Sequence, residues 1–427
     1  MDKFNEKRIH MVGIKGVGMT ALCELLLSYG ASISGSDIGE EFHTDRVLER
    51  LNVKPLNFDA DNITSDIDLI IYSSAYGEDN TERKKATELN ITQMSYAEAL
   101  AEVFNQKKGI MIAGSHGKTT TTALLGQIMI SAGFDPTVIV GGTVIAWDSN
   151  FRAGKSEWMV VEGDEYQNKF LNFRPEYLLI TNIDYDHPDT FPDRESYQEA
   201  FRKLAAQTSK KVLGNFRNRV LKMPQNSVSE IPPVWEPSPS PYLLGEHNQK
   251  NLALVLEFCR EIGIADEKIR KGLSEFSGVR RRMEIYVQTE KLIIIDDYAH
   301  HPAEISATLS ALKNNWPEYK ITVIFQPHTF SRTKVLLSEF AGAFKDADEV
   351  YLAPTYSSAR EGINTEGKNL EKSLFNELKK RHEAVEVFSK WEKGDKRVKG
   401  DKRIIITMGA GDIWQFARKM AKIGHEF

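Results

Sequence analysis

The sequence predicts an α/β protein of three domains, each built on a mostly parallel sheet. Two observations predict this class. Short apolar runs with the length of buried strands recur along the chain, and most precede a segment with the apolar spacing of a helix. Strands that alternate with helices imply parallel sheets joined by right-handed crossovers. The chain has 427 residues, which is more than one core normally holds, so two to four domains of about 100–200 residues are expected.

The first domain is expected over residues 1–106 and opens with a glycine-rich turn between a strand and a helix. This turn, Gly13-Ile14-Lys15-Gly16-Val17-Gly18, can hold a diphosphate at the helix N-terminus, and Asp37 follows the next strand. Its spacing differs from the G-x-G-x-x-G fingerprint, so a nicotinamide cofactor, another nucleotide diphosphate such as a UDP-sugar, and a turn without a ligand all stay open. The strands and helices expected here are Ile9–Ile14, Met19–Tyr29, Ala31–Ser34, Leu69–Ser73 and Tyr96–Val103.

The second domain, expected over residues 107–288, carries the most informative segment of the chain. A buried strand runs into Gly114-Ser115-His116-Gly117-Lys118-Thr119-Thr120, and helical spacing follows. Such a loop aims several backbone N–H groups at one place and can hold a polyphosphate. Lys118 would reach the β- and γ-phosphates of ATP, and the Thr119 hydroxyl would bind Mg²⁺. A glycine turn with a solvated lysine is the alternative, because the full Walker pattern needs a glycine where Ile112 stands.

Acidic side chains stand just past two further expected strands of this domain, Trp158–Glu162 and Tyr177–Thr181. Ligands of open α/β sheets bind beyond the carboxyl ends of the strands. Glu162 and His187, with hydroxyl and phosphate oxygens, could hold Mg²⁺ or Mn²⁺. Taken alone, Glu162 could equally be a solvated acid and His187 a loop or core histidine. The other segments expected here are helices at Glu195–Thr208 and Asn248–Ile262, the segment Ile269–Phe276, and an extended proline-rich connection from Pro224 to Pro241.

The third domain, expected over residues 289–427, repeats the pattern of polar residues after strands. Asp296-Asp297-Tyr298-Ala299-His300-His301-Pro302 follows one strand, and Gln326-Pro327-His328-Thr329-Phe330-Ser331-Arg332-Thr333 follows the next. The planar fork of Arg332 suits a carboxylate. Either run could instead be a capped loop whose polar groups are satisfied internally. The strands and helices expected here are Leu292–Ile295, Ala303–Asn314, Ile321–Gln326, Lys334–Phe344, Glu349–Leu352, Arg403–Met408 and Ile413–Ile423.

Composition excludes several classes of protein. The net charge of −5 gives no broad basic face, so nucleic acid is not an expected partner. The two cysteines, Cys23 and Cys259, lie in apolar helical patterns and are expected to be buried free thiols of a reducing compartment. The N-terminus has no apolar signal core and no run of about 18 apolar residues occurs, so we expect a cytoplasmic protein without a membrane span.

Taken together, these motifs resemble those of the Mur ligase family, and the resemblance covers nearly the whole chain. The motifs keep the family's order, and they favour its alanine-adding branch. Those that carry the resemblance are Gly13–Met19, Ser34–Asp37, Gly114–Thr122, Glu162–Glu165, Thr181–Ile183, Asp186–His187, Gly245–Asn248, Asp296–Pro302, Phe325–Thr333 and Met408–Ile413.

The resemblance implies a Rossmann-like domain that binds a UDP-sugar, a central P-loop-type ATPase domain and a C-terminal Rossmann-like domain. It also implies a ligase, in which the carboxylate of UDP-N-acetylmuramate attacks the γ-phosphate of ATP and the amine of L-alanine then displaces phosphate from the acyl phosphate. Because this chemistry brings anions together, it depends on positioned positive charge, which Lys118 and Mg²⁺ would supply. A monomer or weak homodimer is expected.

The resemblance also assigns a role to each group of candidate residues. The catalytic residues would be Lys118, Glu162, His187, His300 and Arg332. The metal would be held by Thr119, Glu162 and His187. ATP would contact Gly114, Ser115, His116, Gly117, Lys118, Thr119, Thr120, Asn248, Arg281 and Asp297. The UDP-sugar and alanine would contact Gly16, Gly18, Met19, Asp37, Ser73, His300, His328 and Arg332.

Three alternatives stay open. The run Glu162–Tyr166 also resembles the recycling branch of the family, which attaches an intact tripeptide, whereas Gln326–Thr333 favours the alanine-adding branch. Two alternatives belong to other classes of protein. One is a nicotinamide-dependent oxidoreductase, suggested by the first glycine turn, and the other is a UDP-sugar-binding protein without catalysis.

Residues Ala200–Arg202 lack the lysine that several family members carbamoylate, which fits the alanine-adding branch. The stretch Val212–Gly245 is shorter than is usual in the family.

Overall fold

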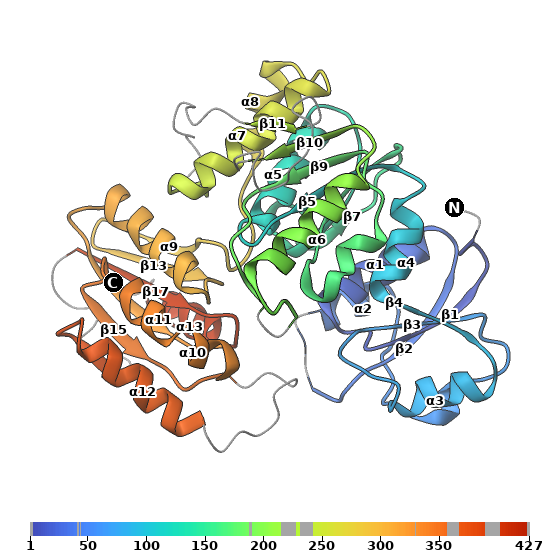
Figure 1. The fold of residues 1–427 in the computed structure, drawn as a ribbon, viewed down its shortest axis with the longest axis horizontal. Coiled ribbons are helices and arrows are strands. Elements are labelled where there is room, and N and C mark those ends of the chain that lie inside the picture. Colours follow the sequence, from blue (N-terminus) through green and yellow to red (C-terminus); the bar gives the residue numbers. More distant parts are fainter. Residues whose placement is uncertain are drawn as a thin grey trace. The chain divides into compact units, whose positions relative to one another are not determined.

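The computed structural model describes residues 3–40, 42, 44–187, 190–214, 228–230, 242–328, 330–356, 367–388 and 402–424. Within them the strands form three sheets, of four, seven and six strands, with helices beside each sheet (Figure 1). The chain divides into two compact units, Met1–Trp235 with Lys250–Ser277 and Glu236–Gln249 with Gly278–Phe427. The first unit holds the first two sheets and the second unit holds the third. The expected α/β fold with mostly parallel sheets is confirmed.

The first sheet has four parallel strands in the order β2-β1-β3-β4. Its elements are β1 (Arg8–Val12), α1 (Val17–Ser28), β2 (Ser32–Ser36), α2 (Asp45–Arg50), the 3₁₀ helix η1 (Ala60–Asn62), β3 (Leu69–Tyr72), α3 (Thr81–Glu88), β4 (Thr92–Ser95) and α4 (Tyr96–Phe104). Leu22 and Leu26 of α1 are fully buried in a core shared with Ile9 of β1. A capping box between Ser95 and Glu98 starts α4 directly after β4.

The second sheet has seven strands and carries the phosphate loop. Its elements are β5 (Lys108–Ala113), α5 (Lys118–Ser131), β6 (Thr137–Val144), η2 (Ile145–Trp147), β7 (Ser149–Arg152), β8 (Trp158–Glu162), η3 (Tyr166–Asn172), β9 (Tyr177–Ile180), α6 (Arg194–Ala206), β10 (Lys211–Gly214), β11 (Val228–Glu230), α7 (Glu246–Glu261) and α8 (Asp266–Glu275). The strand order is β11-β10-β9-β5-β8-β6-β7. Because β5 is parallel to both β8 and β9, the loop after β5 lies beside the ends of those strands.

The third sheet has six strands in the order β12-β13-β17-β14-β15-β16. Its elements are β12 (Glu284–Gln288), β13 (Leu292–Asp297), α9 (Pro302–Asn315), β14 (Lys320–Phe325), α10 (Phe330–Val335), α11 (Leu337–Ala343), β15 (Glu349–Leu352), α12 (Gly367–Lys379), β16 (Val385–Val387), β17 (Arg403–Met408) and α13 (Trp414–Gly424). The edge strand β12 is antiparallel to β13, whereas β13, β17 and β14 are parallel neighbours. The carboxyl ends of these three strands therefore meet at one edge of the sheet.

Several expectations differ from the structure. The single helix expected at Lys334–Phe344 is wrong, because Leu336 has φ −105° and ψ 24° and separates α10 from α11. The strand β12 precedes residue 289, so the third sheet draws its edge strand from before the expected boundary. The proline-rich connection lies outside the described residues, except for β11. The chain passes between the two compact units three times, after Trp235, within α7 after Gln249, and after Ser277.

Two further expectations concern the two cysteines and membrane-spanning helices. Cys23 and Cys259 are both buried free thiols, as expected. Burial raises the pKa of each thiol to about 12, so neither is a reactive thiolate at neutral pH. In the ranges that the structure describes, no helix combines the length and the apolar character needed to cross a membrane.

Candidate active site

The loop between β5 and α5 has a backbone suited to a phosphate group. Gly114 has φ 136°, and Gly117, the N-cap of α5, has φ 81°, a region that favours glycine. A Cβ on Gly114 would stand 2.1 Å from Oγ1 of Thr181, and one on Gly117 would stand 2.4 Å from Nδ2 of Asn251. The first N–H groups of an α-helix have no acceptor within the helix and lie at the positive end of its dipole. The start of α5 is therefore a place for an anion.

The residues after β9 hold the first half of this loop. Asn182 accepts the N–H of Ser115 at its carbonyl (3.2 Å) and the N–H of His116 at Oδ1 (3.0 Å). The amide of Asn182 and the hydroxyl of Thr181 both donate to the carbonyl of His116. The N–H groups of Ser115 and His116 are thus already used, so we expect a phosphate to meet the N–H groups from Gly117 onward. The predicted contacts of Ser115 and His116 with ATP stay predictions.

A buried carboxylate joins two of the predicted catalytic residues. Nζ of Lys118 donates to both oxygens of Glu165, at 3.0 and 2.8 Å, and to the carbonyls of Gly114 and Ser115. On its other side, Oε1 of Glu165 lies 3.5 Å from Nε2 of His187. The side chain of Glu165 is only 2 % exposed. The carboxylate therefore fixes Lys118 and faces His187 at the same time.

The charges in this cluster determine its protonation. Burial alone would lower the pKa of Lys118, but the charge and hydrogen bonds of Glu165, together with the charges of Glu162 and Asp164, outweigh burial and raise that pKa above its ordinary value. Burial alone would raise the pKa of Glu165, but the positive charge of Lys118 and a hydrogen bond with His187 lower it. Both groups are therefore charged at neutral pH, and Lys118 keeps the positive charge that a polyphosphate requires.

A second carboxylate faces the hydroxyl of the loop. Oε1 of Glu162, at the end of β8, accepts a hydrogen bond from Oγ1 of Thr119 (2.9 Å). Its other oxygen, Oε2, accepts the backbone N–H of Gly141 in β6 (2.7 Å). The structure therefore brings the predicted pair of Thr119 and Glu162 into direct contact, and Gly141 orients the acid from the far side.

These oxygens fit the coordination chemistry of Mg²⁺. A hydroxyl and a carboxylate are hard oxygen ligands, and Mg²⁺ usually completes its shell with phosphate and water rather than with an all-protein cage. The described residues hold no group of three His, Cys, Asp or Glu side chains placed to bind a metal by themselves. His187, the third predicted ligand, lies beside Glu165 and Asp186 instead, 3.7 Å from Oδ2 of the latter.

The first sheet carries the other glycine turn, and Asp37 closes it. The buried carboxylate of Asp37 accepts the N–H of Lys15, the N–H of Ile38 and the hydroxyl of Tyr76, each at 2.8 Å. Gly13 has φ 84°, and a Cβ there would stand 2.5 Å from the ring of Tyr76. Asp37, which is predicted to contact the UDP-sugar, thus has three partners within the protein and shapes the turn.

The remaining residues predicted at this turn lie around the start of α1. Gly16 is the N-cap of α1, with no side-chain cap. A Cβ on Gly18 would stand 2.8 Å from the ring of Tyr96, so the backbone approaches the start of α4 closely. Met19 is buried in the core and offers a ligand only its backbone. Ser73 follows β3, where its N–H bonds to the carbonyl of Val12.

In the third sheet, the two acids at the end of β13 are buried. Asp297 accepts the N–H groups of Met283 (2.9 Å) and Ala299 (2.7 Å), and burial raises its pKa to about 6. Asp296 accepts from Nε of Arg281 at 3.2 Å, and burial raises its pKa as well. These acids organise the strand end, and the predicted contact of Asp297 with ATP stays a prediction.

Arg281 and Asn248, both predicted to contact ATP, have partners inside the second unit. The guanidinium of Arg281 donates to the carbonyls of Gly409 and Ala410 as well as to Asp296. Asn248 is 6 % exposed and donates to the carbonyl of Leu244 (2.9 Å). Each side chain therefore holds a loop in place.

The candidate amino-acid residues gather after β13 and β14. Nδ1 of His300 lies 3.0 Å from the carbonyl of Tyr298. Burial, together with the nearby positive charge of Arg332, lowers the pKa of His300 to about 3. The rings of His300 and His328 are 6.0 Å apart, and His328 stacks on Tyr356 at 5.9 Å. The structure thus brings the three predicted residues together and adds an aromatic ring beside them.

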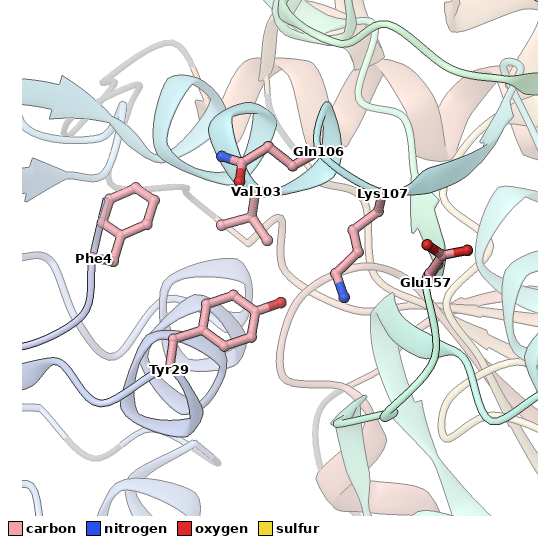
Figure 2. Close-up of a pocket in the computed structure, with 6 residues that line it drawn as sticks. All are labelled: Phe4, Tyr29, Val103, Gln106, Lys107 and Glu157. Atoms are coloured by element: carbon pink, nitrogen blue, oxygen red, sulfur yellow. The ribbon is translucent and has the colours of Figure 1, made fainter. Parts of the chain in front are cut away.

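The first unit also contains a cavity of about 250 Å³, whose lining residues are shown in Figure 2. The buried hydroxyl of Tyr29 lies there, and within the described part of the chain it has no hydrogen-bond partner. None of the predicted site residues lines the cavity, which is formed by Phe4, Tyr29, Val103, Gln106, Lys107 and Glu157.

Sequence reasoning gave no role to three residues that the structure places at the site. Glu165 and Asn182 stand inside quoted motifs, but their partners come from other strands and leave no pattern in the chain. Gly141 did have a signal, because two consecutive glycines inside an apolar strand indicate a bulge or a close approach.

Three protein-family models match the chain along its length. They are the Mur ligase family catalytic domain over residues 8–108, the Mur ligase middle domain over 112–231, and the Mur ligase glutamate ligase domain over 281–411. A UDP-N-acetylmuramate–L-alanine ligase from Desulfitobacterium hafniense is 36% identical and covers 96% of this chain and 99% of its own. A ligase of the same name from Caldanaerobacter subterraneus is 34% identical over 98% of both chains.

Solved structures give the same picture. The UDP-N-acetylmuramate–alanine ligase of Thermotoga maritima superposes with a TM-score of 0.79 at 26% identity, over 98% of this chain and 99% of that one. A murein peptide ligase from Psychrobacter arcticus has a TM-score of 0.70 at 20% identity, over 97% and 98% of the two chains, and shares the fold.

Proposed function

The chain belongs to the Mur ligase family, whose members use ATP to form amide bonds, and we propose that it joins L-alanine to the carboxylate of UDP-N-acetylmuramate in peptidoglycan precursor synthesis. The observation that carries the proposal is the phosphate loop, whose Lys118 meets the buried acid Glu165 and whose Thr119 meets the half-buried acid Glu162. Relatives that bear this activity in their names match over nearly their whole length.

The reaction has two steps. A carboxylate oxygen of the sugar attacks the γ-phosphorus of ATP, and the bond to the β-phosphate breaks to release ADP. The amine of L-alanine then attacks the acyl carbon of the acyl phosphate, loses a proton and expels inorganic phosphate. The first step brings two anions together, and the second expels inorganic phosphate, so catalysis depends mainly on positioning and on positive charge.

The residues of the phosphate loop would supply that charge. Lys118 is charged and would exchange its carbonyl and carboxylate partners for phosphate oxygens. Bound Mg²⁺, or Mn²⁺, supplies further positive charge to the phosphate oxygens. Thr119 and Glu162 would hold this metal, and His187 would lie at the neighbouring carboxylate Glu165.

The amine step would use the residues after β13 and β14. Arg332 offers a planar fork for the carboxylate of alanine. His300, with its pKa near 3, is neutral at physiological pH and offers polar atoms without adding charge. His328 would line the same alanine site. Because ATP and UDP-sugars are cytoplasmic metabolites, the proposal places the reaction in the cytoplasm, and a monomer or weak homodimer stays a prediction.

The recycling ligase that attaches a tripeptide is the nearest second candidate. The run from Glu162 to Tyr166 favours it, whereas the relatives above 30% identity are named for alanine. A nicotinamide-dependent oxidoreductase would not explain the phosphate loop or the acids beside it. A binding protein without catalysis would bind UDP-N-acetylmuramate and release no ADP.

An assay of ADP release with UDP-N-acetylmuramate and a panel of amines tests the proposal. We expect release with ATP, Mg²⁺ and L-alanine, and far less with glycine, with a murein tripeptide or without an amine. Faster turnover with the tripeptide would assign the recycling activity instead. No release with any amine would leave only the binding function.

A further inference from the structure

A buried asparagine connects the two glycine-rich regions of the first unit. Asn150, in β7, is 4 % exposed. Its Nδ2 donates to the carbonyl of Val17, at 3.0 Å, and lies 3.4 Å from the carbonyl of Val140 in β6. Val17 is the first residue of α1, directly after the N-cap Gly16. One side chain therefore links the turn that would hold the UDP-sugar to the sheet that carries the phosphate loop.

An irregularity in the sheet makes room for this side chain. The strands β6 and β7 pair at Ile139 and Phe151 and next at Val144 and Ser149, so β6 leaves the ladder between these points. Asn150 stands opposite the gap. Its amide bonds to the carbonyl of Val140, which lies between the two paired points. Because an amide nitrogen carries two hydrogens, one Asn side chain can serve two carbonyls.

The same stretch of β6 reaches the acid of the phosphate site. β6 and β8 are paired up to Ile139 and Val161, which brings the following residues side by side. The N–H of Gly141 donates to Oε2 of Glu162 at 2.7 Å, and a Cβ on Gly141 would stand 2.6 Å from that oxygen. From Val17 to Glu162, the connection consists of three hydrogen bonds, the side-chain amide of Asn150 and the peptide unit between Val140 and Gly141.

We propose that Asn150 is a positioning residue for the ligase reaction, which sets the start of α1 in register with Glu162. This inference rests on the proposed function. The reacting carboxylate is one end of the UDP-sugar, whose diphosphate would lie at the start of α1, while the γ-phosphate would lie at Thr119 and Glu162. A misplacement of about 1 Å between reacting groups can cost roughly a hundredfold in rate. A link of fixed length between the start of α1 and Glu162 would therefore help to hold the reacting carboxylate at the right distance from the γ-phosphate.

The chemistry of the amide makes the role specific. In Asn150→Asp, a carboxylate replaces the donor and faces two carbonyl oxygens. In Asn150→Ala, both carbonyls lose the side-chain donor. Either change breaks the link without touching a residue of the phosphate loop. Loss of a buried hydrogen bond corresponds to a change of about tenfold in a binding or rate constant.

A second asparagine provides a matched control. Asn105 also joins the first two sheets, because its Nδ2 donates to the carbonyl of Asn172 (3.2 Å) and its Oδ1 accepts the N–H of Arg174 (2.7 Å). It lies at the C-cap of α4. Asn105→Asp removes the same donor from the same pair of sheets, but contacts neither Val17 nor β6.

The test measures kcat and KM for each substrate by ADP release, and the Kd of UDP-N-acetylmuramate by calorimetry. In Asn150→Asp and Asn150→Ala, we expect kcat/KM for the UDP-sugar to fall about tenfold or more, with a lower kcat. The KM for ATP should change less than twofold. Asn105→Asp should keep all constants within twofold, and the melting temperature of every variant is measured beside its constants.

Three outcomes would overturn the inference. They are wild-type constants in both Asn150 variants, an equal loss in Asn105→Asp, or an equal loss for every substrate. The proposed function fails separately, because it predicts turnover by the wild-type chain. If the wild type does not turn over, the calorimetric Kd of the UDP-sugar still decides the matter, since the Asn150 variants should raise it at least fivefold.

Discussion

At Lys118, one ammonium group donates to two loop carbonyls and both oxygens of Glu165. In the proposed mechanism, phosphate oxygens replace some of these acceptors when ATP binds. Glu165 therefore keeps the lysine charged and in place, so that the site requires little rearrangement of charge on binding.

We expect Lys118→Ala to lower the rate of ADP release by roughly a thousandfold, because removal of one positioned donor commonly costs 10²–10³ in rate and this donor is also charged. Binding of UDP-N-acetylmuramate, measured by calorimetry, should stay within twofold. Lys169→Ala is the matched control, because Lys169 pairs with the adjacent Asp164 at 3.1 Å and lies outside the loop. Turnover that persists in Lys118→Ala would remove the loop from the mechanism.

Asp297 and His300 have opposite effects on the pH dependence of stability. Burial raises the pKa of Asp297 from 3.8 to about 6, so the folded state binds more protons than the unfolded state between these values and loses stability as the pH rises. Burial lowers the pKa of His300 from 6.5 to about 3, so the unfolded state binds more protons and stability rises with pH. Between pH 4 and 6 the two slopes oppose each other.

Replacement of Asp297 should leave the effect of His300 on the pH dependence of stability unopposed. Relative to the wild type, Asp297→Asn should gain stability as the pH rises from 4 to 6, by up to about 3 kcal/mol from a shift of about two pKa units. The measurement is the melting temperature of both proteins across this range. A constant difference between the two at every pH would show that Asp297 does not titrate there.

At the scale of the elements, three strand ends build the phosphate site. The loop after β5 supplies the lysine and the hydroxyl, the end of β8 supplies the carboxylates, and the residues after β9 hold the loop. The strand β6, which lies between β8 and β7, contributes through its backbone alone, because the N–H of Gly141 orients Glu162. A glycine is required here by space, since its φ lies outside the left-handed region and a Cβ would stand 2.6 Å from the carboxylate.

Gly141→Ala should therefore displace Glu162 and raise the Mg²⁺ concentration for half-maximal activity about tenfold, with little change in the binding of UDP-N-acetylmuramate. A titration of ADP release with Mg²⁺ measures this. In the control Gly342→Ala, the new Cβ would meet only a terminal atom of Arg381, at 3.0 Å, which can move aside. If the Mg²⁺ dependence of Gly141→Ala equals that of the wild type, Glu162 does not hold the metal.

The elements also show what the sequence could predict and why. Strands such as β8 and β17 were located because both of their faces are buried, which makes a continuous apolar run. The strands β4 (Thr-Gln-Met-Ser) and β7 (Ser-Asn-Phe-Arg) lack such a run, because they lie at sheet edges and polar residues fill them. At the site, local spacing identified Lys118 and Thr119. The partners Glu165, Asn182 and Asn150 depend on which strands become neighbours, and spacing along the chain does not record that.

On the scale of the whole molecule, the candidate residues are divided between two compact units. The glycine turn of the first sheet and the phosphate loop of the second sheet belong to the first unit. His300, His328 and Arg332 belong to the second unit. A ligand that binds only the folded state of one unit stabilises that unit, by about 2.7 kcal/mol at a concentration of 100 times its Kd. The assignment of substrates to units can therefore be measured by thermal unfolding.

In scanning calorimetry of the full chain, we expect UDP-N-acetylmuramate to raise the melting transition of the first unit and to leave that of the second in place. The transitions can be assigned with two core variants, Leu124→Ala in α5 and Leu309→Ala in α9, because each removes a fully buried side chain from one unit and should lower only its own transition. If the UDP-sugar raises the transition that Leu309→Ala lowers, its predicted site at the start of α1 is wrong. That result would also remove the reason for Asn150 to connect α1 with Glu162, because the reacting carboxylate would then arrive from elsewhere.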